Sequence, residues 1–387
     1  MDLIYHEIKP SNDIQGVNGF TEYNTIDFNV IAPGRKMLGK TVKIAAQLIV
    51  NTNGVSAPTG TRKAPGDNIY LDHKIGAHAV FSSIQCEISG GPKAQVLENL
   101  QEYPRYCSLL HTASRKELDA CSVISSAELK GSFEANGSIN IEQQKTNVAN
   151  ASVAADEDPS FCITPKICFN QSMGDSYSFS KNGNIKISCN LARTVNAFYG
   201  QDMSSQVTYS LQNVRLLFTS IPDDGKEGKM MMSSYVMVKS TMVSSQVNVQ
   251  ARVPSRAVKS VSIVFLRQKQ ESSLVQNTNE LQSLPQLDEV SYSFQDTLTN
   301  YVTYNITDLN DALIRGVESV PGNRPLHNSS QPELRAANRS YILGTDFDNQ
   351  ILDLSAQKFG FLCKSKFSGI SNDQRLVYLF FHTELML

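Results

Sequence analysis

Alternation of apolar and polar residues with a period of two is the feature that most constrains the fold of this chain. It recurs in segments rich in Val, Ile, Thr, Tyr and Phe, the residues that strands favour. A period of two places successive side chains on opposite faces of an extended strand, which is typical of half-buried antiparallel strands. The pattern therefore predicts an all-β protein. The predicted strands are Thr25–Ile31, Val42–Val50, Ala79–Ile88, Ile185–Leu191, Gln206–Phe218, Tyr235–Val249, Ala257–Leu266, Val290–Ile306, Lys358–Phe367 and Arg375–His382.

Helical patterns are few and short. One helix is predicted over Lys93–Tyr103, ending near Pro104, and a second over Asp308–Val320, with Asp308 as its N-cap. Polar stretches without periodicity predict surface loops longer than ordinary turns. These stretches are Asn51–Asp67, Glu134–Pro159 and Gly322–Ser340.

Two domains are expected from the length of 387 residues, which is long for a single compact domain. Turn-forming and charged residues cluster at Ile221–Gly228, directly after a strong strand. This cluster predicts an N-terminal β domain over residues 1–221 and a second β-rich domain over residues 222–387. Each part is large enough for a sandwich of roughly eight strands.

Charge and hydropathy exclude several classes of function. The 35 Lys and Arg residues nearly balance the 37 Asp and Glu residues, so no global field attracts nucleic acid or anionic lipid. The apolar runs are far shorter than the roughly 18 residues that a membrane span needs, the nearest being Arg375–Phe381. The first residues also lack the pattern of a secretory signal. We expect a protein that folds in cytosol or nucleoplasm, with no membrane span and no specific nucleic acid partner.

The segment Gly34–Thr41, GRKMLGKT, matches the phosphate-binding pattern G-x-x-x-x-G-K-[ST]. A phosphate-binding loop needs a helix directly after it, yet the following residues Val42–Val50 alternate as a strand does. The intervening positions also carry bulky residues where a tight anion site favours small ones. We therefore predict no nucleotide site, and a β-hairpin connection between the strands Thr25–Ile31 and Val42–Val50 instead.

No catalytic, cofactor-binding or metal-binding residues are predicted. The six histidines are scattered, and no GxSxG or HExxH motif is present. Asp72 with His73, and the acidic run Asp156–Asp158, could bind a metal ion, but solvated charge is the simpler interpretation. Met230, Met231, Met232 and Met237 could form a soft-metal site, although alternation from Tyr235 onward favours a core strand.

The cysteines show no metal-binding spacing. There are seven, an odd number, without a CxxC pair. In a chain without a secretory signal this pattern predicts reduced thiols that pack as small apolar side chains, and no zinc site. The cysteines are Cys86, Cys107, Cys121, Cys162, Cys168, Cys189 and Cys363.

Sandwich domains, long loops, near-neutral charge and the lack of a chemical motif together suggest a self-assembling structural protein such as a viral capsid subunit. Three segments, Gly19–Val50, Phe161–Gly200 and Ile351–Leu387, carry a resemblance over most of the chain. Their order of features resembles the penton, or minor capsid, proteins of virophages and polinton-like viruses, and Sputnik-type virophages are the most similar.

The resemblance implies a jelly roll with a second, upper or inserted β domain, in which the last strand, Arg375–His382, can return to the first domain. It implies a homopentamer that plugs each fivefold vertex of an icosahedral double-stranded DNA virus among trimers of the major capsid protein. It also implies a virion protein that assembles in the host cytoplasm, with no enzyme activity and no cofactor. The Gly34–Thr41 segment would then be the turn between the first two jelly-roll strands.

Two alternatives stay open. Halves of about 220 and 165 residues also suit a major capsid protein with two jelly rolls. A cytosolic β-sandwich module that binds a receptor or glycan through its loops is the third possibility. Five, three or one copies in the purified assembly correspond to the penton, the major capsid protein and the module.

Overall fold

The protein is mostly antiparallel strand, which confirms the predicted all-β class. The computed structural model describes residues 2–13, 19–51, 70–72, 75–90, 93–114, 139–140, 160–171, 176–200, 207–225, 230–242, 245–251, 253, 257–271, 273–279, 281, 287–295, 300–320, 342–347, 360–367 and 374–386. Within these ranges four larger antiparallel sheets form two sandwich-like bodies with a few short helices.

The first body contains sheets A and B. Sheet A runs in the order β10 (Ser160–Ile163), β5 (Lys43–Asn51), β14 (Thr208–Pro222), β4 (Arg35–Leu38) and β11 (Ser176–Ser178), and β1 (Ile4–Ile8) and β2 (Phe20–Thr21) also pair with β14. Sheet B runs in the order β3 (Thr25–Val30), β12 (Asn184–Leu191), β7 (Phe81–Ser89) and β8 (Gln95–Gln101). A small sheet C joins β13 (Phe198–Tyr199), β6 (Tyr70–Leu71) and β9 (Ile139–Asn140).

The second body contains sheets D and E. Sheet D runs in the order β15 (Met231–Met242), β22 (Arg375–Met386), β17 (Val258–Arg267) and β20 (Leu343–Asp346). Sheet E runs in the order β16 (Gln246–Ala251), β21 (Gly360–Phe367), β18 (Leu287–Gln295) and β19 (Asn300–Ile306). The short helices of the two bodies are η1 (Gly76–Val80), α1 (Tyr103–Ser114), η4 (Cys168–Asn170), α3 (Phe179–Asn182), α4 (Thr194–Ala197), η5 (Gln268–Gln270) and α5 (Leu309–Glu318).

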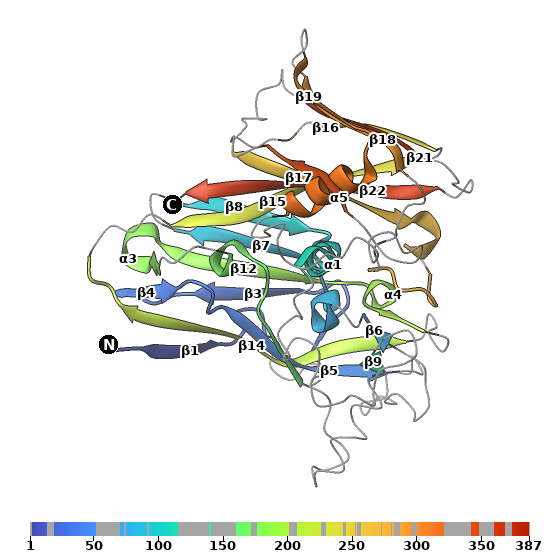
Figure 1. The fold of residues 1–387 in the computed structure, drawn as a ribbon. Coiled ribbons are helices and arrows are strands. Elements are labelled where there is room, and N and C mark those ends of the chain that lie inside the picture. The colour runs from blue at the N-terminus through green and yellow to red at the C-terminus, as the bar shows by residue number, and fades with distance from the viewer. Residues whose placement is uncertain are drawn as a thin grey trace.

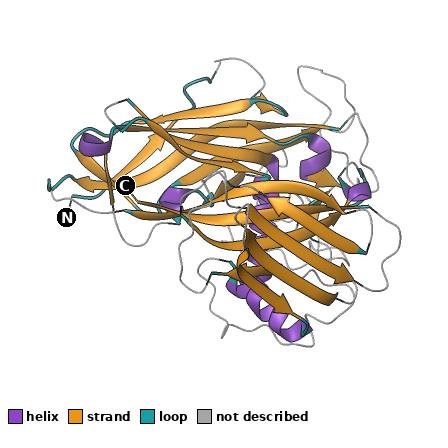
Figure 2. Cartoon of the chain, turned by 90° about the horizontal axis from the view of Figure 1, so that it is seen from above, coloured by secondary structure: helices purple, strands orange, loops and turns teal. Residues whose placement is uncertain are grey.

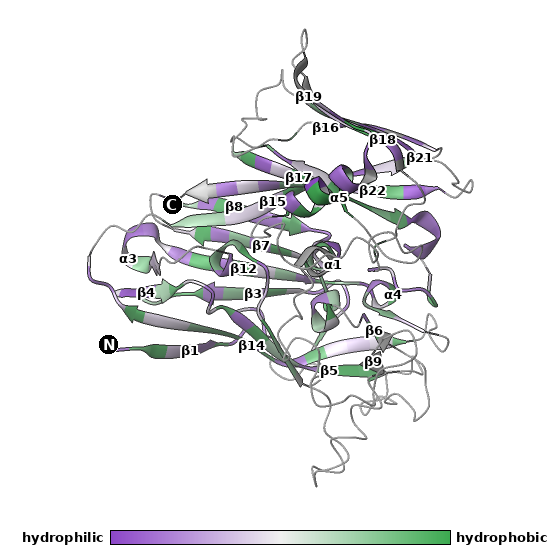
Figure 3. Cartoon of the chain, viewed as in Figure 1, coloured by the Kyte–Doolittle hydropathy of each residue, from purple (hydrophilic) through white to green (hydrophobic). Residues whose placement is uncertain are grey.

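The sheets stack in the order A, B, D, E (Figure 1). Seen from above, strands make up the bulk of both bodies and the helices are short pieces between them (Figure 2). The hydropathy colouring shows green, apolar residues alternating with purple ones along many strands (Figure 3). Sheets B and D therefore lie inside the stack, where each has a neighbouring layer on both faces.

Strand β22 belongs to sheet D and has apolar side chains on both of its faces. Its residues Leu376, Tyr378 and Phe380 belong to a core cluster shared with the first body, whereas Val377, Leu379 and Phe381 belong to the core of the second body. All six side chains are buried. The sequence of a strand buried on both faces is a continuous apolar run rather than an alternation of apolar and polar residues. The run Arg375–Phe381 is thus the sequence of an interior strand.

Each predicted strand overlaps an observed strand. The structure divides two of the predicted segments. Tyr235–Val249 contains most of β15 and most of β16, which lie in different sheets. Val290–Ile306 contains most of β18 and all of β19, which pair with each other. Period-two alternation continues from one strand into the next, so it does not reveal where one strand ends and the next begins.

The predicted helix over Lys93–Tyr103 is wrong. Residues Gln95–Gln101 form β8, which pairs with β7, and α1 begins at Tyr103. Pro104 therefore lies in the first turn of a helix rather than after its end, a position where its missing N–H costs no hydrogen bond. The helix predicted at Asp308–Val320 is confirmed as α5, and the Asp308 carboxylate accepts a hydrogen bond from Asn310 N. Among the described residues no helix is long and apolar enough to cross a membrane.

The chain passes from sheet A to sheet D between β14, which ends at Pro222, and β15, which begins at Met231. We propose on this ground that residues 1–221 and 222–387 are the two domains. Strand β22 lies between β15 and β17, both of which belong to the second part. The predicted loops Asn51–Asp67 and Gly322–Ser340 lie outside the described residues, except for Asn51 itself. The same holds for Glu134–Pro159, except for the two residues of β9.

Candidate functional site

The Gly34–Thr41 segment forms a turn, a strand and a second turn. Gly34 has a φ of 68°, residues Arg35–Leu38 form β4, and Lys40 has a φ of 63°. The chain then continues as β5, so no helix follows the second glycine. A phosphate-binding loop depends on the N–H groups of such a helix. The backbone of this segment is therefore not that of a nucleotide site.

The predicted hairpin between Thr25–Ile31 and Val42–Val50 is also wrong. β3 pairs with β12 in sheet B, whereas β5 pairs with β10 and β14 in sheet A. The residues between them form β4, which pairs with β11 and β14. The segment therefore carries the chain from one layer of the sandwich to the other, and it is not a simple turn between two jelly-roll strands either.

Lys36 is the buried cation of this segment, with only 6% of its surface exposed. Its ammonium forms ion pairs with Asp224 and, at 3.6 Å, with Asp223, which follow β14 directly. Asp223 also accepts a hydrogen bond from Ser178 of β11. The hydrogen bond to Asp224 raises the pKa of Lys36, and the hydrogen bond from Ser178 lowers the pKa of Asp223. Lys36 thus fixes the end of the first body to the residues that lead to the second.

We expect magnesium ATP to leave the melting temperature of the protein unchanged. A ligand stabilises a folded protein only if it binds the folded state, and here the helix that would hold the phosphates is replaced by β5. Thermal unfolding of the wild type and of Lys40→Ala, with and without magnesium ATP, measures this. Lys40 is exposed, so its replacement is a mild control. An ATP-dependent rise that is lost in Lys40→Ala would restore the nucleotide hypothesis.

A buried Ser–His pair is brought together by strand register. His382 Nε2 of β22 lies 2.8 Å from Ser262 Oγ of β17, and Ser262 Oγ lies 2.7 Å from Ser319 Oγ. His382 Nδ1 has no hydrogen-bond partner in the described part of the chain. Nucleophilic catalysis needs a base oriented by a third group and a nucleophile that substrate can reach. Ser262 is fully buried, so this pair supports packing rather than chemistry.

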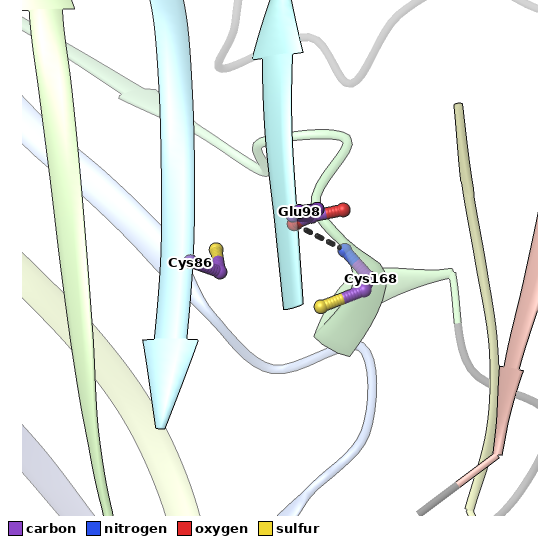
Figure 4. Close-up of side chains that lie close together, drawn as sticks. All are labelled: Cys86, Glu98 and Cys168. Carbon is purple, nitrogen blue, oxygen red and sulfur yellow. Dashed lines mark hydrogen bonds between the residues drawn. The ribbon is translucent and has the colours of Figure 1, made fainter. Parts of the chain in front are cut away.

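A cluster of three potential ligands lies at the junction of the two bodies (Figure 4). Cys86 comes from β7, Glu98 from β8 and Cys168 from η4. Both sulfurs and a carboxylate oxygen of Glu98 lie within 4.8 Å of one another, and all three residues are buried. We call these residues the Cys–Glu cluster. Sequence analysis missed it because 70 residues separate Glu98 from Cys168 and no spacing motif links them.

Glu98 joins the cluster to the second body. Its Oε1 accepts a hydrogen bond from Cys168 N at 2.8 Å, and its Oε2 accepts one from Ser234 Oγ of β15 at 2.9 Å. Burial raises the pKa of Glu98 and raises that of Cys168 to about 11, while the pKa of Cys86 is also raised by burial. The raised pKa values favour the protonated forms of the two thiols and the carboxyl group, and these forms can donate hydrogen bonds to one another.

The other candidate metal groups divide between described and undescribed residues. Asp72 is buried and accepts hydrogen bonds from Ile75 N and Asn277 Nδ2, whereas its neighbour His73 and the run Asp156–Asp158 lie outside the described residues.

Of the methionines, Met230 and Met232 are buried, Met237 packs partly buried against the same core, and Met231 is half-exposed, in agreement with the core-strand prediction. Of the cysteines, Cys121 is not described, Cys162 is half-buried and the other five are buried.

Aromatic rings fill the space between the two bodies. Tyr106 of α1 lies 4.0 Å from Tyr235 and 5.6 Å from Phe380, measured between ring centroids. Beside them the guanidinium of Arg105 lies over the ring of Tyr378, 4.7 Å from its centroid, and forms an ion pair with Glu102. Helix α1 thus contributes side chains that pack against sheet D, and these contacts help to hold the two bodies together.

No family model and no curated protein matches the sequence. Solved structures do match its fold. A structure of PBCV-1 VP54 fitted into a reconstruction of the virophage Sputnik aligns with a TM-score of 0.56 at 10% identity, covering 100% of this chain and 95% of the other. The Faustovirus major capsid protein aligns at 0.54 and 9% identity, covering 100% and 90%. The mavirus major capsid protein aligns at 0.52 and 7% identity, covering 99% and 89%.

These matches correct the resemblance to penton proteins. The likeness covers the whole of this chain and nearly the whole of structures described as major capsid proteins, including both sandwich bodies. The described parts of the three sequence segments that suggested a penton lie in strands of both bodies and in short elements between them. At this level of identity the matches establish the fold, which is all-β and similar to a double jelly roll.

Proposed function

We propose that this chain is a viral major capsid protein of the double jelly-roll type, the alternative that the sequence left open. The observation that carries the proposal is the match along the full length to the major capsid proteins of Faustovirus and mavirus. A subunit that provides both sandwiches in one chain agrees with the two bodies and four stacked sheets described above.

The packing between the bodies supports a structural role. A shell subunit has to transmit load between its neighbours, and close-packed interiors have low compressibility. The contact of Tyr106 of α1 with Tyr235 and the hydrogen bond from Ser234 to Glu98 both cross the junction of the bodies. The proposed role is therefore non-enzymatic, and no cofactor is part of it.

The proposed partners are further copies of the same chain, in closed trimers, within the shell of a virion that assembles in the host cytoplasm. A closed ring of identical subunits forms when each copy contacts its neighbours through two different surfaces and the rotation closes. The shell then requires contacts among trimers in addition to those within them. A binding module, the remaining alternative, requires neither.

We expect the purified protein to contain three copies of the 42.7 kDa chain. Native mass spectrometry and light scattering measure the number of copies directly. Five copies would contradict the major capsid assignment, and a single copy that stays monomeric at high concentration would favour the binding module.

The protein composition of purified virions gives an independent test of the major capsid proposal. In purified virions that contain this chain we expect it to be the most abundant protein, because a major capsid protein builds the faces of the shell. Quantitative mass spectrometry of the particles, referenced to known amounts of each protein, measures its abundance. A low copy number, or absence from the particles, would contradict the proposal.

A further inference from the structure

The Cys–Glu cluster places three acidic groups together without a cation. In the part of the chain that the structure describes, no lysine, arginine or histidine forms a hydrogen bond or ion pair with Glu98. A buried carboxyl group avoids the cost of an isolated charge by staying protonated, by pairing with a cation or by binding a metal. Two thiols beside such a carboxyl supply the kinds of donor atoms that a soft or borderline metal ion can use.

The donor atoms are close enough to share one ion. Bonds of about 2.3 Å to sulfur and about 2.0–2.2 Å to oxygen place the ligand atoms of a tetrahedral zinc site about 3.3–3.8 Å apart. The donor atoms here lie within 4.8 Å of one another, so small side-chain rotations bring them to these separations. Their positions are held by a strand pair, β7 with β8, and by η4, whose Asn170 exchanges hydrogen bonds with both backbone groups of Val42.

We propose that Cys86, Glu98 and Cys168 bind one zinc ion at the junction of the two bodies. Thiolates select soft or borderline metals over calcium and magnesium, and the carboxylate is an accepted third zinc ligand. The fourth position is taken by Ser234 Oγ, which already contacts Glu98, or by a water molecule. The inference does not depend on the proposed capsid function.

Proton release follows from the chemistry. Zinc binds thiolates and carboxylates, so the protons of Cys86, Cys168 and Glu98 leave as the metal enters. Two positive charges from zinc replace these protons and leave the site with a net charge of −1. Because zinc displaces these protons, zinc affinity should increase with pH.

The first experiment measures metal content and stability of the full chain under reducing conditions. We expect about one zinc per chain after purification with zinc present, proton release on titration of the metal-free protein, and a lower melting temperature after chelation. Cobalt in place of zinc should give the absorption band of thiolate-to-cobalt charge transfer. Metal-free protein whose melting temperature does not respond to zinc, and that shows no such band, would overturn the proposal.

Variants then assign the ligands. Cys86→Ala and Cys168→Ala should each abolish the cobalt band and the response to zinc. Cys189→Ala is the matched control, because Cys189 is equally buried in the same sheet but lies outside the cluster, and it should retain both. Loss of the band in Cys189→Ala alone, or retention in both cluster variants, would place the metal elsewhere and refute the site. If a cluster variant fails to fold, the wild-type titrations still decide.

Discussion

Replacement of Phe380 by alanine is expected to lower the free energy of unfolding by about 3–5 kcal/mol. Phe380 is fully buried in β22, and its ring centroid lies 5.2 Å from that of Tyr235 and 5.6 Å from that of Tyr106. The alanine variant loses the transfer free energy of the ring and leaves a cavity that rigid strands on both sides cannot fill. The expected loss is a large part of the total stability of a typical protein.

Chemical denaturation of Phe380→Ala and of Tyr5→Ala tests this expectation. Tyr5 lies on β1 with 79% of its surface exposed, so its replacement should change the free energy of unfolding by about 0.5 kcal/mol or less. Similar effects of the two replacements would mean that the ring of Phe380 does not belong to a packed junction between the bodies.

Acid is expected to destabilise the protein below pH 6.5 through two buried histidines. Burial lowers the pKa of His78 and of His382 from 6.5 to about 3. In the unfolded chain both rings take up a proton near pH 6.5, whereas in the folded protein they stay neutral until about pH 3. The stability is therefore complete above pH 6.5 and is lost progressively as the pH falls towards 3. At pH 5 the loss is about 2 kcal/mol for each histidine.

Denaturation of the wild type and of His382→Gln at pH 7.5 and pH 5.0 measures the effect. The variant has no ring to protonate, so its stability should fall less between the two pH values than that of the wild type. His6→Gln is the comparison: burial also lowers the pKa of His6, but this residue lies on β1 and is only half-buried, so its replacement should reduce the acid sensitivity less. Equal acid sensitivity of the wild type and His382→Gln would show that the ring of His382 takes up its proton in the folded state.

Strand content was predictable because alternation is a local signal. It located β3, β5, β12 and β21 within a residue or two. The same signal failed where a tertiary contact overrides it: Gln95–Gln101 looks helical in isolation, yet its edge pairing with β7 makes it a strand. Pro104 predicts the end of a helix, although proline is equally suited to the first turn of one.

The layer to which each strand belongs was not predictable. β3 and β5 are near neighbours in the sequence, but their partners β12 and β14 come more than a hundred residues later. The same holds for the side-chain clusters. Ser262 meets His382, and Cys86 meets Cys168, only through the register of distant strands and the position of η4. Such pairs carry no spacing motif, so one sequence cannot reveal them.

The position of β22 has a consequence for synthesis of the protein. β22 lies in the middle of sheet D, yet every other described strand is translated before it. Until β22 has been synthesised, β15 and β17 each expose an unpaired backbone edge. Tyr106 of α1 also lacks its contact with Phe380. Unpaired edges and exposed apolar surface promote aggregation. A chain that stops short of residue 375 therefore lacks the central strand of sheet D and the residues that β22 contributes to both cores.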